Sequence, residues 1–145
     1  MAHTLSLLVP YTESPSSLRG LEFAFQLARG DKNMRVHAVY VVEVDRRLPL
    51  DAELPEEFQQ GGRCLAEADR LAREYQATCD GDILQARDAG AAIVDEAVEL
   101  GAEMIVMGVA PHAKERTVLH LGKTADYVLR HAPCEVVIVR DGTHA

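Results

Sequence analysis

The stretch Ala102–Arg140 constrains the fold more than any other, because it contains the pattern of a strand, a loop, a helix and a second strand in succession. Glu103–Met107 is a short apolar run, too short for a helix and long enough for one buried strand. A helical pattern begins at Gly122. The β-branched run Val136–Val139 follows it and is typical of a buried strand in a parallel sheet. The stretch therefore predicts one strand–helix–strand unit.

Two glycines in this stretch suggest an anion site. Gly108 stands at the carboxyl end of the first strand, and Gly122 stands at the amino end of the helix. Glycine permits a close backbone approach, and the free N–H groups of a helix amino end point at a bound anion. The loop between them carries cationic and histidine side chains, which fit an anion-binding loop and an ordinary solvated loop equally well. These side chains belong to His112, Lys114, Arg116 and His120.

The rest of the chain repeats the alternation of strand and helix. Three further strands are predicted at Thr4–Val9, Val36–Val42 and Ile83–Ala86. Three further helices are predicted from Pro15 to Gly30, over Glu56–Thr78, and from Asp88 to Gly101. Ser14 suits the N-cap of the first of these helices, since Pro15 fits the first helical position. Asp88 suits the N-cap of the third.

This order predicts an α/β fold, with a single doubly wound parallel sheet of five strands and helices on both faces. The length of 145 residues fits one domain over 1–145, and we find no internal repeat or domain boundary. Ligands of such sheets bind at the carboxyl ends of the strands, where the winding reverses. Here the reversal falls between the first and fourth strands, and it brings Pro10–Ser14 next to Met107–His112.

Composition excludes some classes of function and indicates a compartment. The formal net charge of -8 argues against binding to nucleic acid or to an anionic membrane surface. We find neither a leader-like segment nor an apolar run that approaches the ~18 residues of a membrane span, so no membrane insertion is expected. The three cysteines, Cys64, Cys79 and Cys134, lack a CxxC spacing and are expected to be reduced thiols of a cytoplasmic protein.

Three specific hypotheses find little support in the sequence: a Walker loop, a metal site and a serine nucleophile. Gly122–Thr124 looks like the end of a Walker loop, but that loop needs a glycine at Thr117. His120 and His131 lack a second pair at metal-ligand spacing. We find no nucleophile elbow of the type Gly-x-Ser-x-Gly. No catalytic residue and no metal ligand is therefore predicted.

Over essentially its whole length the chain resembles the universal stress protein family. The resemblance is closest in AEMIVMG at Ala102–Gly108 and in GKTADYVLRHAPCEVVIVR at Gly122–Arg140, with support between Pro10 and Ala28. It implies strand order 3-2-1-4-5 and a homodimer formed through the last strand, here Val136–Arg140. It also implies a non-catalytic stress-response or regulatory module. A weak nucleotide-hydrolysing enzyme and the soluble regulatory domain of a membrane transporter are the alternatives.

The resemblance also implies an adenine-nucleotide site, with ATP as the expected ligand. Members that hold ATP have a loop with the order Gly, two residues, Gly, nine residues, Gly, and then Ser or Thr. They also have an aspartate just after the first strand, and backbone at the end of the second strand meets the adenine. The positions of this chain that correspond are Pro10, Thr12, Val41, Val42, Met107, Gly108, Pro111, Gly122, Lys123 and Thr124.

Several of these positions depart from the family pattern. Pro111 replaces the second glycine and lacks an N–H donor, and the loop is one residue longer than the motif. Thr12 replaces the aspartate, and Lys123 replaces the hydroxyl residue, where it could hold phosphate as a point charge. The departures predict that ATP or another adenine nucleotide binds weakly or not at all.

Overall fold

The computed structural model describes residues 4–110 and 121–140, in which five parallel strands alternate with four helices. The strand order is β3-β2-β1-β4-β5, so the predicted fold class and winding are confirmed. The strands are β1 (Leu5–Pro10), β2 (Met34–Glu43), β3 (Thr78–Ala86), β4 (Met104–Val109) and β5 (Glu135–Arg140). The helices are α1 (Pro15–Ala28), α2 (Pro55–Glu74), α3 (Ala89–Leu100) and α4 (Lys123–His131).

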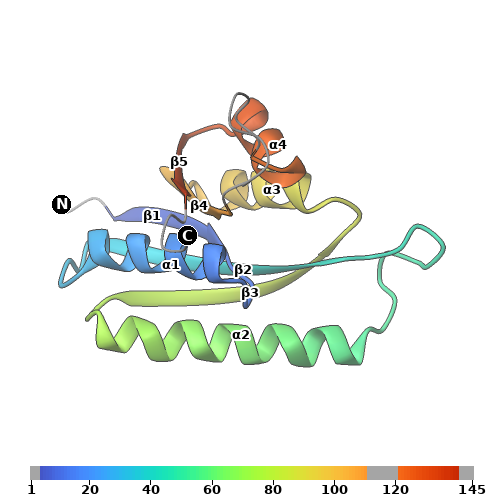
Figure 1. Cartoon of the computed structure of the whole chain (residues 1–145), viewed down its shortest axis with the longest axis horizontal. Helices are drawn as coiled ribbons and strands as arrows, with labels where there is room; N and C mark the ends of the chain where they lie inside the picture. The colour runs from blue at the N-terminus through green and yellow to red at the C-terminus, as the bar shows by residue number, and fades with distance from the viewer. Residues whose placement is uncertain (1–3, 111–120, 141–145) are drawn as a thin grey trace.

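The sheet lies between two helical layers, with α1 and α2 on one face and α3 and α4 on the other (Figure 1). Strand β1 is central, and its alternating side chains enter both layers. Leu7 and Val9 join the core beneath α1 and α2, whereas Leu8 joins the core beneath α3 and α4. All three are almost completely buried. Alternate side chains of a strand point to opposite faces, so a strand buried on both faces is apolar throughout.

The boundary between α2 and β3 differs from the sequence prediction. Helix α2 ends at Glu74 and β3 begins at Thr78, whereas the sequence predicts a helix to Thr78 and a strand from Ile83. Gln76 has a positive φ of 55°, which ends the helix early. The first half of β3 contains Asp80 and Asp82, which pair with Arg35 and His37 of β2. Pairing with β2 therefore allows a polar segment to form a strand that its own sequence pattern does not predict.

Gly61, which falls within the predicted helix, allows α2 to pack closely on the sheet. A Cβ at this position would lie 2.8 Å from the Tyr40 ring and 3.0 Å from Ile83. A Cβ on the neighbouring Gly62 would meet nothing within 4 Å. Val44, in the connection between β2 and α2, is 3% exposed and belongs to the core.

The last strand is less buried than the sequence predicts. Each side chain of Val136–Val139 is half-buried and packs against one of the two core clusters. The run Val136–Val139 does form a strand, but the prediction that this strand is buried is wrong. The reason is that β5 is an edge strand, which pairs with β4 on one side and has no described neighbour on the other. Among the described helices, none is long and apolar enough to cross a membrane.

Truncating Ile105 should test the interior position of β4 in the sheet. This side chain is completely buried, so Ile105→Ala is expected to lower the free energy of unfolding by about 2–5 kcal/mol through lost transfer energy and a cavity. Chemical denaturation followed by circular dichroism measures the change. Val98→Ala is the control, because Val98 is 63% exposed and should change stability by less than about 0.5 kcal/mol. A loss below about 1 kcal/mol for Ile105→Ala would contradict an interior position of β4.

Candidate functional site

The carboxyl ends of β1, β2 and β4 lie along one edge of the sheet and contain half of the predicted site residues. Strands β1 and β4 pair through Leu7–Met104 and Leu8–Ile105, which confirms that the winding reverses between them. Pro10 ends β1, Val41 and Val42 stand near the end of β2, and Met107 and Gly108 lie in the second half of β4. The side chains of Val42 and Met107 belong to the core, so these two residues can offer a ligand mainly backbone.

Thr12 takes part in a hydroxyl network that closes the amino end of α1. Its backbone N–H donates to Ser17 Oγ at 3.1 Å, and its own Oγ1 accepts from the backbone N–H of Ser14 at 3.2 Å. Ser14 is the N-cap that the sequence predicts, because its side chain accepts from the Ser17 N–H at 3.2 Å. The amino end of α1 is therefore satisfied by the chain's own side chains.

Gly108 is required for packing, whatever else it does. A Cβ on Gly108 would lie 1.7 Å from the Ser16 carbonyl oxygen, and a Cβ on Gly20 would lie 2.6 Å from the Gly108 nitrogen. The first turns of α1 therefore rest directly on the backbone of β4. A glycine at this place in the sequence is explained by helix–strand contact before any ligand is considered.

Among the described residues, no side chain caps the amino end of α4. Gly122 is its N-cap with φ of 91°, in a conformation that favours glycine, and makes no capping hydrogen bond through a side chain. Lys123 follows with its side chain 85% exposed, and its Nζ lies 3.8 Å from Asp88 Oδ1. Thr124 is partly buried. Three of the predicted site residues thus stand at the amino end of a helix, where the first N–H groups have no partner within the helix itself.

Lys123 and Thr124 line a pocket of about 380 Å³ between the amino ends of α3 and α4. The other lining residues are Glu43, Asp88, Ala89, Gly90, Ala91, Asp126, Tyr127 and Arg130. Arg130 Nε lies 3.0 Å from Asp126 Oδ2, so each of the two cations in the lining already faces a carboxylate. With three carboxylates against two cations, the pocket carries a net negative charge.

Glu43 takes the capping role that the sequence assigns to Asp88. Asp88 is the N-cap residue of α3, but its side chain makes no capping hydrogen bond. Instead, the backbone N–H of Ala89 donates to Glu43 Oε2 at 2.8 Å. Glu43 ends β2 and is far away in sequence, so local pattern could not have predicted this contact. The positive amino end of α3 is thus neutralised by a carboxylate of the protein itself.

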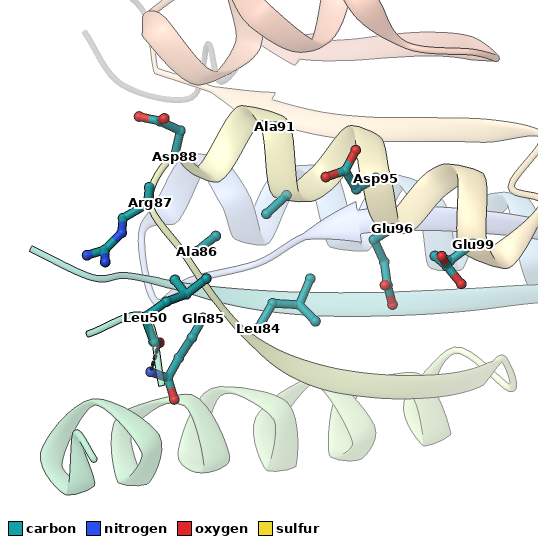
Figure 2. A pocket seen from close by; sticks show the side chains of 11 residues that line it. Leu50, Leu84, Gln85, Ala86, Arg87, Asp88, Ala91, Asp95, Glu96 and Glu99 are labelled. Carbon is teal, nitrogen blue, oxygen red and sulfur yellow. Dashed lines mark hydrogen bonds between the residues drawn. The ribbon is translucent and has the colours of Figure 1, made fainter. Parts of the chain in front are cut away.

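A second pocket, of about 390 Å³, lies beside α3 and was not predicted (Figure 2). It is lined by Leu50, Leu84, Gln85, Ala86, Arg87, Asp88, Ala91, Ala92, Asp95, Glu96 and Glu99. The amide of Gln85 donates to the carbonyl groups of Leu50 and Ala52, which fixes the loop at its rim. Arg87 donates to the Asp45 carbonyl at 2.7 Å. The four carboxylates of the lining make this pocket unsuited to phosphate.

Pro111, the last of the predicted site residues, and the polar loop that follows it lie outside the described residues.

The three cysteines, Cys64, Cys79 and Cys134, are free. Burial raises the pKa of all three thiols, that of Cys79 to about 12, so the nucleophilic thiolate form is disfavoured at neutral pH.

Comparison with known proteins decides the family. The model of the universal stress protein family matches residues 5–140. The chain belongs to this family. Among solved structures, a universal stress protein from Archaeoglobus fulgidus is 23% identical, with a TM-score of 0.74 and coverage of 94% of both chains. A family protein from Burkholderia pseudomallei is 25% identical, with a TM-score of 0.70 and coverage of 92% of this chain and 94% of the other.

A third solved structure is the Archaeoglobus fulgidus universal stress protein in complex with dAMP. It is 21% identical, with a TM-score of 0.72 and coverage of 96% of this chain and 99% of the other. A search among curated protein sequences finds no match. The family and its fold are therefore shown, and the ligand of the present chain has to be argued from its own residues.

Replacing Gly108 should destabilise the protein even when no ligand is present. The Cβ of Gly108→Ala meets the Ser16 carbonyl, so we expect a loss of about 1–3 kcal/mol or more in the free energy of unfolding. Gly62→Ala is the control, because its Cβ meets nothing within 4 Å and the residue lies inside α2. It should gain about 0.5–1 kcal/mol. Equal effects of the two substitutions on the denaturation midpoint would contradict the packing role of Gly108.

Proposed function

We propose that this universal stress protein is a non-catalytic regulatory module that binds an adenine nucleotide weakly, at the sheet edge where β1, β4 and the amino end of α4 meet. The observation that carries the proposal is the amino end of α4, where Gly122 provides no side-chain cap and Lys123 stands exposed beside a pocket. Such an end combines free N–H donors with a positive helix dipole, and both favour phosphate.

The charges around α4 limit how much phosphate this edge can hold. Glu43, Asp88 and Asp126 line the adjoining pocket, and Asp88 faces Lys123 directly. Each carboxylate repels a phosphate group, and the repulsion grows with the number of phosphate charges. A nucleoside monophosphate therefore fits the local charge better than a triphosphate. The Archaeoglobus fulgidus protein, which shares the fold, is in complex with dAMP, which is such a monophosphate.

Thr12 gives a second reason for weak binding. In place of a carboxylate it offers a hydroxyl that is already engaged with Ser14 and Ser17. A ligand that needs this hydroxyl must compete with the cap of α1. The loss of one hydrogen bond to a charged group costs about 1.5–3 kcal/mol, which corresponds to about tenfold to hundredfold in affinity.

Calorimetry with AMP, cyclic AMP and ATP tests the proposal. We expect ATP to bind no more tightly than AMP, and Lys123→Ala to weaken AMP binding by about tenfold to hundredfold. Binding should also weaken as salt rises, because Lys123 is exposed to screening. Lys32→Ala is the control, because Lys32 is an exposed lysine just before the amino end of β2. Sub-micromolar ATP binding that Lys123→Ala leaves unchanged would contradict the proposal.

A further part of the proposal is assembly into a homodimer through Val136–Arg140. Support comes from the outer edge of β5, which no described strand pairs, and from the half-exposed apolar side chains of Val136–Val139. An unpaired edge strand with an apolar surface favours pairing with a second copy about a two-fold axis.

We also place the module in the cytoplasm, since its three cysteines are free.

Light scattering at micromolar concentration tests this assembly, and the expected mass is twice that of the 15.9 kDa chain. Val137→Pro should shift the protein toward the monomer, because proline disturbs the hydrogen bonding and shape of the edge strand. Circular dichroism confirms that the variant is folded. A monomeric wild type, or a folded Val137→Pro variant that stays dimeric, would contradict the proposed interface.

A further inference from the structure

Three side chains with metal-binding atoms converge on the sheet face that α3 covers, away from the nucleotide edge. They are His37 of β2, Asp82 of β3 and Glu96 of α3. Glu43, at the rim of the pocket near α4, lies six residues further along β2, which is about 20 Å at the usual rise of a strand. The cluster is therefore separate from the proposed nucleotide site.

The distances within this cluster match those between the ligands of one metal ion. His37 Nε2 lies 3.0 Å from Asp82 Oδ2 and 3.6 Å from Glu96 Oε2, and the three ligand atoms all lie within 4.8 Å of one another. Metal–ligand distances of about 2.0–2.1 Å at tetrahedral angles place neighbouring ligand atoms about 3.3 Å apart. The two distances from Nε2 fall on either side of that value.

Hydrogen bonding alone does not account for the convergence. Both carboxylate oxygens approach the same ring nitrogen, and Nε2 carries at most one hydrogen. That hydrogen can serve Asp82 at 3.0 Å, which leaves Glu96 at 3.6 Å, beyond hydrogen-bond distance. Within the described part of the chain, Glu96 has no ion-pair partner other than His37. A cation placed between the three atoms would serve all of them.

The cluster is held by three packed elements and opens to solvent on one side. The side chains of His37 and Glu96 are 14% and 16% exposed, whereas that of Asp82 is 55% exposed. His37 is paired in register with Asp80, so Asp82, two residues further along β3, points to the same face of the sheet. Two ligands are thus nearly fixed, and the third leaves a path for an ion to enter.

We propose that His37 Nε2 and one oxygen each of Asp82 and Glu96 bind a divalent transition-metal ion, with water completing the coordination, and that Zn²⁺ fits best. The imidazole selects a transition metal over Mg²⁺ or Ca²⁺, which prefer oxygen ligands alone. The two carboxylates neutralise the charge of the ion. Three protein ligands with an open fourth position suit the tetrahedral preference of Zn²⁺.

Competition of the purified protein with a chromogenic zinc chelator tests the site. In His37→Gln we expect the protein to bind one Zn²⁺ ion fewer, or to bind it about a hundredfold or more weakly. Even the loss of a group that only hydrogen-bonds to a metal ligand costs about 10–100-fold in affinity. The glutamine amide has a similar reach but is a poor metal ligand. His131→Gln is the matched control, because His131 is an exposed histidine of α4 outside the cluster.

A second matched pair of variants keeps the test decisive if His37→Gln does not fold. Asp82→Asn should weaken Zn²⁺ binding, whereas Asp80→Asn should not, because Asp80 pairs with Arg35 on the same face. Zn²⁺ should also raise the unfolding temperature of the wild type, and Mg²⁺ at the same concentration should not. Zinc affinity and stoichiometry that are unchanged in folded His37→Gln and in Asp82→Asn would overturn the proposal.

Discussion

The direct contact between the backbones of α1 and β4 is the constraint on which the site edge depends. Gly20 and Gly108 let the helix and the strand approach without side chains between them. This contact places the first turn of α1, with its capping hydroxyls, against the end of β4 where the winding of the sheet reverses. A Cβ at either glycine would push the two elements apart. The shape of the edge is thus set by packing before any ligand contributes.

Electrostatics then decide what that edge can hold. The amino ends of α3 and α4 both open into one pocket, and two positive helix ends would normally favour a strongly charged anion. The chain supplies part of the negative charge itself: Glu43 caps α3, and Asp88 faces Lys123. These carboxylates are the reason why the proposed ligand carries few phosphate charges, since their repulsion grows with the charge of the ligand.

The half of the sheet formed by β2 and β3 uses polar side chains in a different way. Asp80 and Asp82 lie on one face of the edge strand β3 and pair with Arg35 and His37 of β2. Arg35 and Asp80 form an ordinary exposed ion pair, worth little to stability. Around His37 the addition of Glu96 from α3 changes the geometry from a pair to a convergent cluster. The proposed metal site therefore depends on a helix that only the fold brings over these strands.

The sequence by itself determined the alternation of strands and helices, because buried apolar runs and helical periodicity are local signals. The parallel sheet follows from that alternation, and the strand order was implied by the family resemblance. The sequence also indicated Ser14 as the N-cap of α1 and Gly122 as the residue at which α4 begins. It failed where contacts join distant segments. Tertiary structure alone decided that Glu43 caps α3, that β3 starts at Thr78, and that Val137 lies at a half-buried edge. It alone brought Glu96 to His37, because such contacts depend on how elements pack, which no local pattern encodes.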